Sequence, residues 1–236
     1  MGASGGVAML GLVLALAHEP AHSIALTIDV TPLMPMSDAQ LQAMVSETNA
    51  LWKPHRVVFR WITSTAASDP PLHGVVRVLS EGCRLVPLCL PVGTSAGESR
   101  PAGRRLGAVV FPEGSATPDD TLMLSMDAVV QAVEQVTWQN RRLADLPTDT
   151  RGYLVGRALG RVLAHELGHY LLASRSHART GLMRPEFRAD QLIGLSRNGF
   201  ALSETEMPLL RLRLVQLAER SLDLTNTHDG FPIERR

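Results

Sequence analysis

The stretch RGYLVGRALGRVLAHELGHYLL, residues 151–172, decides the fold that the sequence predicts. It contains no proline, and its apolar residues recur at helical spacing: Leu154, Val155, Leu159, Val162, Leu163, Leu167 and Leu171. That period predicts a long helix with one face buried in a core. Gly156, Gly160 and Gly168 each lower the intrinsic stability of such a helix by about 1 kcal/mol relative to alanine, so packing against other elements must hold it in place.

The same helix carries the motif His165-Glu166-Leu167-Gly168-His169. Residues four apart lie on one face of a helix, so both imidazoles can reach a single ion. Zinc binds nitrogen donors at about 2.0–2.1 Å, and a catalytic zinc site has three protein ligands and leaves the fourth position to water. Glu166 lies beside the two histidines, where a carboxylate can act as general base on that water. The alternative is that both histidines are ordinary surface or core residues.

The residues before this helix predict strands and shorter helices. Ser37 is the expected N-cap of a helix over residues 38–52, which Pro54 ends. Residues 87–107 are rich in proline, glycine and serine and predict a surface loop, and residues 127–138 predict a short helix. Alternating, β-branched and aromatic residues predict strands at residues 23–30, 56–62, 73–80, 107–111 and 121–125.

After the motif, the sequence predicts mainly helical structure. Ser203 is the expected N-cap of a last helix that runs to about residue 222, with Glu204 and Glu206 in its first turn. The whole order predicts an α+β fold with a mixed twisted sheet, a long active-site helix and a mainly helical C-terminal subdomain. We assign residues 23–224 to one domain, between an N-terminal apolar segment (residues 1–22) and a C-terminal tail (residues 225–236).

The charge balance excludes several classes of partner. Lysine and arginine total 23, and aspartate and glutamate also total 23. A general nucleic-acid binder carries a basic excess, so we expect no nucleic-acid partner and no attraction to an acidic membrane surface. Hydrophobic residues make up 45% of the chain, enough for a real core. Of the eight histidines, three lie between positions 165 and 177.

The N-terminus predicts either export or a buried helix. The apolar run GGVAMLGLVLALA, residues 5–17, is shorter than the roughly 20 residues that cross a membrane, so we expect no stable span. Its length suits a signal peptide, and Ala15-Leu16-Ala17 has the form of a cleavage site, although no basic residue precedes it. A signal peptide implies a periplasmic or extracellular protein, and a buried helix implies a cytoplasmic one. Cys83 and Cys89 are expected to form a disulfide after export or to be inert thiols.

The segment HELGHYLLASRSHARTGLM, residues 165–183, resembles the zinc-binding segment of metzincin metallopeptidases, matrixins and archaemetzincins above all. In that superfamily an HExxHxxGxxH helix and turn supply three histidines, and a downstream methionine turn lies beneath the metal. Met183 follows His165 at a spacing similar to that in matrixins. The likeness extends over residues 24–220, but only residues 165–183 are specific. It implies a metzincin-like fold, one catalytic Zn²⁺ and a peptide or protein substrate.

The chain departs from the family pattern after the second histidine. Leu172 replaces the family glycine, and Arg175 stands where the family has its third histidine. Arginine stays protonated and cannot bind zinc, so His177 is the expected third ligand through a longer turn. The alternative is a gluzincin-type site in which Glu186, with Asp190 behind it, is the third ligand.

The sequence therefore predicts a zinc metalloendopeptidase. Zinc is held by His165, His169 and His177, and peptide bonds are hydrolysed by a metal-activated water with Glu166 as general base. The alternative, suggested by Leu172 and Arg175, is a catalytically inactive zincin-fold binding module. Glu166 favours the enzyme, because purely structural zinc sites close all four positions with protein ligands. Arg184, directly after Met183, is expected either to stabilise an oxyanion or to form a surface salt bridge.

Overall fold

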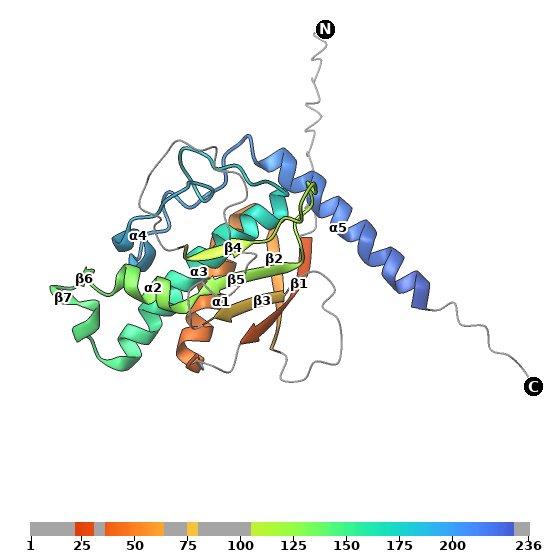
Figure 1. Cartoon of the computed structure of the whole chain (residues 1–236). Helices are drawn as coiled ribbons and strands as arrows, with labels where there is room; N and C mark the ends of the chain where they lie inside the picture. The colour runs from red at the N-terminus through yellow and green to blue at the C-terminus, as the bar shows by residue number, and fades with distance from the viewer. Residues whose placement is uncertain (1–21, 31–35, 64–74, 80–104, 229–236) are drawn as a thin grey trace, which may run out of the picture.

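The computed structural model describes residues 22–30, 36–63, 75–79 and 105–228 (Figure 1). The apolar segment at residues 5–17, the two cysteines and most of the expected loop at residues 87–107 lie outside these ranges, so the expectations for them stay predictions. Among the described helices, none has the length and apolar content needed to cross a membrane.

The predicted α+β architecture is confirmed. A five-stranded sheet has the order β2-β1-β3-β5-β4, in which β4 is an antiparallel edge strand and the other neighbours run parallel. The strands of this sheet are β1 (His22–Val30), β2 (Val57–Thr63), β3 (Val75–Leu79), β4 (Gly107–Val109) and β5 (Thr121–Ser125).

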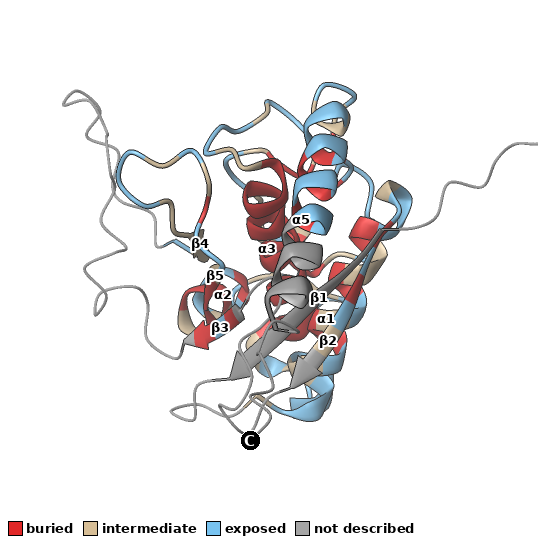
Figure 2. Ribbon diagram, turned by 90° about the vertical axis from the view of Figure 1, so that its right-hand side faces the viewer, coloured by how far each residue is buried: buried red, intermediate tan, exposed pale blue. Residues whose placement is uncertain are grey.

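Two helices pack together on one face of the sheet, α1 (Asp38–Trp52) and α3 (Thr148–Leu172), as Figures 1 and 2 show. In β2 the side chains alternate, so that Val57 and Phe59 are buried while Val58 and Arg60 are exposed. Most of α3 is buried, from Leu154 onward, because it lies between the sheet and the elements that follow it. The position of α3 places the predicted zinc-binding motif next to edge strand β4.

Local signals set the ends of α1 as expected. The Ser37 side chain accepts from the Gln40 backbone, and the Gln40 side chain accepts from the Ser37 backbone, which completes a capping box. The helix ends at Trp52, and a short 3-10 turn, η1 (Lys53–His55), contains Pro54. The buried Trp52 indole then donates to the Ala164 carbonyl at 3.2 Å, which ties α1 to α3 beside the motif.

Two of the α3 glycines allow the two helices to approach closely. A Cβ atom at Gly160 would lie 2.6 Å from the Met44 carbonyl oxygen and 2.8 Å from the Glu47 Cβ. A Cβ atom at Gly156 would overlap the Gln40 backbone in the same way. Thr48 donates from its hydroxyl to the Gly160 carbonyl at 3.1 Å across this contact. The glycines that weaken the isolated helix are thus required by its packing.

We predict opposite effects of adding a methyl group at two glycines of α3. Gly160→Ala forces the helices apart and should lower the free energy of unfolding by about 1–3 kcal/mol. Gly152→Ala is the matched control, because a Cβ atom there would lie 3.6 Å from the nearest atom and the helix gains propensity, so up to about 1 kcal/mol of stabilisation is expected. Urea unfolding gives the free energy of unfolding of both variants. Equal changes in the two variants would contradict the close contact of α1 and α3 at Gly160.

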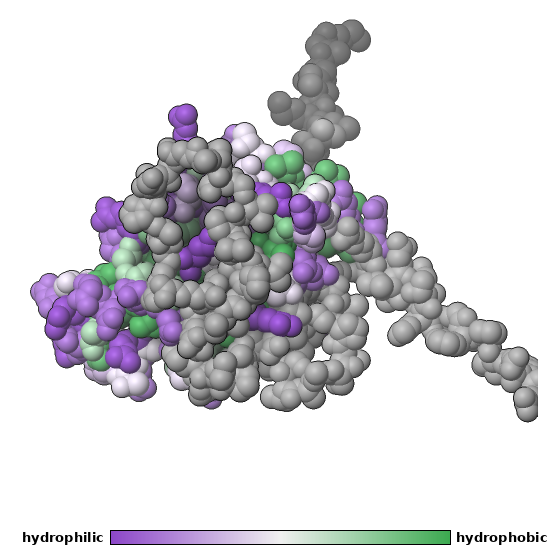
Figure 3. Space-filling view, in the orientation of Figure 1, coloured by the Kyte–Doolittle hydropathy of each residue, from purple (hydrophilic) through white to green (hydrophobic). Residues whose placement is uncertain are grey.

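The expected end of the helix at residues 127–138 was wrong. The predicted helix at residues 127–138 is α2 (Met126–Val133), after which β6 (Thr137–Trp138) and β7 (Arg141–Arg142) form a hairpin. Gln139 and Asn140 both have positive φ, which suits a tight hairpin turn and cannot continue a helix. A 3-10 turn, η4 (Leu143–Asp145), leads from the hairpin to α3. Hydrophilic residues gather over the β6–β7 end of the molecule in Figure 3, in agreement with the exposure of residues 139–142.

The part after α3 contains α4 (Ala189–Ile193) and α5 (Met207–His228). Ser203 is not the N-cap of α5. Its backbone N–H and its hydroxyl both donate to the Glu206 carboxylate, at 2.6 and 2.8 Å, within a turn over residues 204–206. The helix begins at Met207 because Pro208 suits a first helical turn, where the missing N–H is not needed. It ends at His228 rather than near residue 222.

Candidate metal centre

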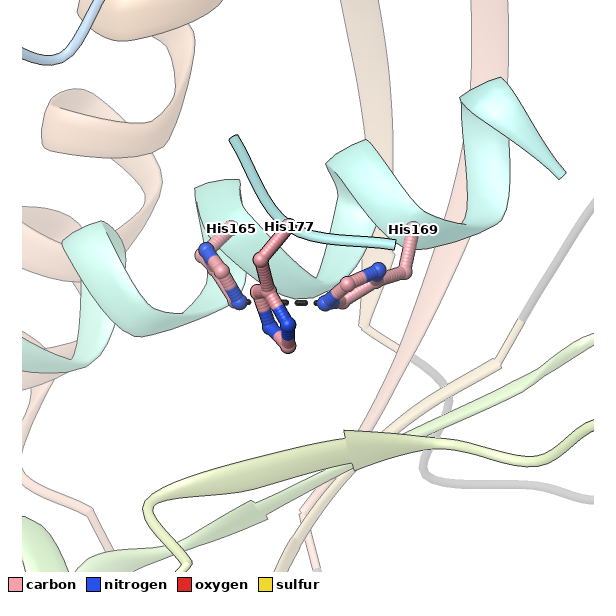
Figure 4. A group of neighbouring side chains, drawn as sticks. All are labelled: His165, His169 and His177. Carbon is pink, nitrogen blue, oxygen red and sulfur yellow. Dashed lines mark hydrogen bonds between the residues drawn. The ribbon is translucent and has the colours of Figure 1, made fainter. Parts of the chain in front are cut away.

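The structure brings three histidines together. The ligand atoms of His165, His169 and His177 all lie within 4.8 Å of one another, and no other such group of histidine, cysteine or acidic side chains occurs among the described residues. His165 and His169 project from the same face of α3, and His177 comes from the loop that passes alongside the helix (Figure 4). The two helical histidines are buried, while His177 is exposed. The site therefore has a closed side toward α3 and an open side toward solvent.

Backbone acceptors fix the orientation of both helical imidazoles. His165 Nδ1 lies 2.8 Å from the Leu182 carbonyl, and His169 Nδ1 lies 2.7 Å from the Ser174 carbonyl. A carbonyl oxygen only accepts, so each Nδ1 carries the proton and each Nε2 presents a lone pair. These two Nε2 atoms face each other at 3.1 Å. Two lone pairs at that distance repel each other unless a cation lies beside both.

The distances fit a zinc ion. Two nitrogens bound to one tetrahedral zinc lie about 3.3 Å apart, because each Zn–N bond is about 2.0–2.1 Å long. The observed separation of 3.1 Å between His165 Nε2 and His169 Nε2 is close to this value. The hydrogen bonds to Leu182 and Ser174 are of the kind that hold zinc-ligating histidines in place.

Burial also keeps the two helical histidines in the form that binds metal. It lowers the pKa of His165 and of His169 to about 4. Burial lowers the pKa of His177 as well. Metal binding requires neutral imidazoles, so all three side chains are ready for a cation at neutral pH without losing a proton first.

The chain leaves α3 later than the metzincin pattern does. Leu172 is still helical, and Ala173 adopts the left-handed conformation with φ 47°. The turn therefore lies one position after the place of the family glycine, and the third histidine follows later as well. Arg175 contacts residues 111 and 115 instead of the histidines. Its guanidinium lies over the Phe111 ring at 4.7 Å and donates to the Phe111 and Ser115 carbonyls. It thereby fixes the loop that carries His177.

The acidic alternatives for the third ligand lie outside the histidine group. Glu186 is exposed and does not belong to the group of ligand atoms within 4.8 Å. Asp190 forms an ion pair with Arg188 at 2.8 Å on the surface. The geometry of the described residues thus favours His177 as the third ligand.

Met183 packs against α3. It is buried, and a Cβ atom at Gly168 would overlap its sulfur atom, so its side chain packs directly on α3 at Gly168. Its carbonyl accepts from the Ala178 N–H at 2.8 Å, which joins it to the residue after His177. Met183 therefore joins the loop to α3 by packing, and its role as a methionine turn stays a prediction.

Glu166 lies between α3 and the edge strand β4. A Cβ atom at Gly107 would be 2.8 Å from Glu166 Cγ and 2.9 Å from its Oε1, so this glycine provides the room for the carboxyl group. Burial raises the pKa of Glu166 to about 8, and the nearby Arg105 opposes the rise. A divalent cation at the histidines would add a stronger positive charge and favour the carboxylate form.

We predict that Glu166 makes the metal-free protein less stable as the pH rises. Its pKa is about 8 in the fold and 4.5 in the unfolded chain, so folding keeps a proton that the unfolded chain releases. The stabilising effect is complete below pH 4.5 and is lost as the pH rises to 8. Relative to metal-free Glu166→Gln, the metal-free wild type should therefore lose stability over this range. Urea unfolding with a chelator present measures this, and a difference that does not change with pH would refute the assignment.

Sequence reasoning missed several residues that shape the site. Gly107 and Phe187 lie outside the motif segment and contact Glu166 and His165, respectively, and the Leu182 carbonyl, within that segment, accepts from His165. Phe187 contacts the His165 ring edge to face, with centroids 5.5 Å apart. Only Gly107 carried a local signal, because glycine in a strand often marks a close approach of another group.

Comparison with solved structures shows a similarity of fold. No family model matches the sequence, and no curated protein matches it. The fold is similar to the crystal structure of an archaemetzincin from Methanopyrus kandleri, with a TM-score of 0.46 and 14% sequence identity, over 85% of this chain and 99% of that chain. The function is therefore inferred from the residues of the site.

Proposed function

We propose that this protein is a zinc-dependent metallopeptidase. The observation that carries the proposal is the pair of Nε2 lone pairs facing each other at 3.1 Å, with a third imidazole beside them and a buried glutamate next to them on the helix. His165, His169 and His177 would hold the zinc ion. Three protein ligands leave a position open, which is typical of catalytic zinc sites and not of structural ones.

Bound zinc would supply Lewis acidity, which polarises a peptide carbonyl and makes a water molecule more acidic. Glu166 would accept the proton of that water and pass it to the leaving amine. Gly107 allows the carboxyl group of Glu166 to lie beside β4. Because β4 is an edge strand and His177 is exposed, a peptide could reach the site from solvent.

The proposal is tested by metal analysis together with a digest of casein and of a peptide library. We expect one zinc ion per chain and cleavage that a chelator abolishes and added zinc restores. A protein that holds no zinc, or a zinc-loaded protein that cleaves none of these substrates, would overturn the proposed activity.

We predict that His177 and not Glu186 contributes to metal affinity. Loss of a group that only supports a ligand costs about 10–100-fold in metal affinity, so loss of the ligand itself in His177→Ala should weaken zinc binding by more than about 100-fold. Glu186→Gln is the matched control and should bind zinc as the wild type does. Competition with a zinc-binding dye gives both affinities. The reverse result would assign the third position to the acid.

A further inference from the structure

The loop that carries the third histidine is rich in positive charge. Its sequence ASRSHARTGLMRPEFR, residues 173–188, contains four arginines and one glutamate. Arg188 is neutralised by Asp190, at 2.8 Å. Arg175 donates to backbone carbonyls, which carry no net charge. The wall of the metal centre formed by this loop is therefore more cationic than the chain as a whole.

Arg184 is linked to the site through the Phe187 ring. Its guanidinium carbon lies 4.4 Å from the centroid of the Phe187 ring and 5.2 Å from that of Phe200. Phe187 in turn contacts the His165 ring. The Nε and Nη2 atoms of Arg184 are buried and have no hydrogen-bond partner within the described part of the chain. The guanidinium of Arg184 lies against these two aromatic rings.

Such a charge needs a counter-ion. A cation taken out of water is costly unless an anion or hydrogen-bond acceptors compensate for it. With three neutral imidazoles, a zinc ion would add two further positive charges, and Glu166 supplies a single negative one. The site as a whole favours an anionic ligand.

We propose that the site selects peptides that carry a carboxylate close to the scissile bond, and that Arg184 is the cation that recognises it. The inference rests on the proposed peptidase function. Arginine forms charge-assisted hydrogen bonds with a carboxylate, and Arg184 is only partly exposed, so the carboxylate has to reach its buried Nε and Nη2 atoms from inside the site. The carboxylate comes from an aspartate or glutamate side chain or from a free C-terminus, since both have the same chemistry.

The experiment uses the zinc-loaded full chain and a set of matched peptides. The first series is a neutral peptide that the enzyme cleaves, made with an amidated C-terminus and with glutamine, glutamate or lysine beside the scissile bond. The second series is a shortened form of the same peptide, made with either a free or an amidated C-terminus. Binding is measured by fluorescence anisotropy with Glu166→Gln, which does not turn the peptide over, and cleavage is measured as kcat/KM with the wild type. A glutamate peptide should bind and react about tenfold better than its glutamine counterpart. If only the peptide with a free C-terminus binds and reacts better, the recognised carboxylate is the C-terminal one.

Arg184→Gln should abolish the preference, and Arg188→Gln, from the same loop but with its charge already neutralised, should retain it. Zinc content and the thermal midpoint verify that each variant is folded. Arg184→Lys keeps the charge and should keep part of the preference for the glutamate peptide. If Arg184→Gln does not fold, a reduced preference in Arg184→Lys tests the role of Arg184 in its place. Equal binding of the three peptides, or an undiminished preference in Arg184→Gln, would overturn the inference. Preferential binding without any cleavage would overturn the proposed peptidase function and leave carboxylate recognition standing.

Discussion

Glu166→Gln should lower the peptidase activity by about 10²–10⁴-fold while the protein retains its zinc. The amide has nearly the same shape as the carboxylic acid and fits the space beside Gly107, but it cannot accept a proton at neutral pH. Glu166 does not belong to the group of metal-ligand atoms, so the metal should remain bound. The measurement is kcat/KM on a cleaved peptide, together with the zinc content of the same sample.

The control for this prediction is His169→Ala. This variant removes a ligand, so activity and zinc should be lost together, whereas in Glu166→Gln they separate. An active Glu166→Gln enzyme would contradict the role of Glu166 as general base. Loss of zinc in Glu166→Gln would instead assign Glu166 to the metal shell.

Glu47→Ala should lower the free energy of unfolding by about 3–5 kcal/mol, a large fraction of the stability of a domain. The Glu47 carboxylate is buried in α1 and contacts three arginines, at 2.9 Å from Arg161, 2.7 Å from Arg197 and 3.9 Å from Arg157. Arg161 is completely buried, and burial lowers its pKa while Glu47 opposes that change. Removal of Glu47 leaves Arg161 with the backbone carbonyls of residues 191, 194 and 196 and the Phe200 ring, none of which carries a negative charge.

The surface pair of Arg188 and Asp190 provides the comparison. Both side chains are exposed, and such a pair contributes about 0–1 kcal/mol, so Asp190→Ala should change stability little. Urea unfolding of both variants measures the contrast. A cost below about 1 kcal/mol for Glu47→Ala would show that the three arginines do not depend on this carboxylate.

Local signals predicted much of the fold. Ser37 and Pro54 act through their own backbone neighbours, and both ends of α1 followed from them. The turn at Gln139 and Asn140 was missed because neither residue is glycine, although both adopt positive φ. The ion pair between Glu47 and Arg161 joins residues 114 positions apart, and no local rule connects them.

The candidate site was predicted in a similar way. The spacing of His165 and His169 on a helix is a local property, so their approach could be predicted. The approach of His177 depends on the left-handed turn at Ala173, which no glycine announces. The contact of Glu166 with Gly107 arises only when α3 packs beside β4, and the sequence alone does not reveal this packing.

A crystal structure of the zinc-loaded protein, with anomalous data collected at the zinc edge, tests the central claim most directly. We predict a single peak about 2.0–2.1 Å from one nitrogen of each of His165, His169 and His177, with a solvent molecule in the remaining position. The absence of a peak at these histidines, or a fourth protein side chain in the open position, would contradict a catalytic zinc site.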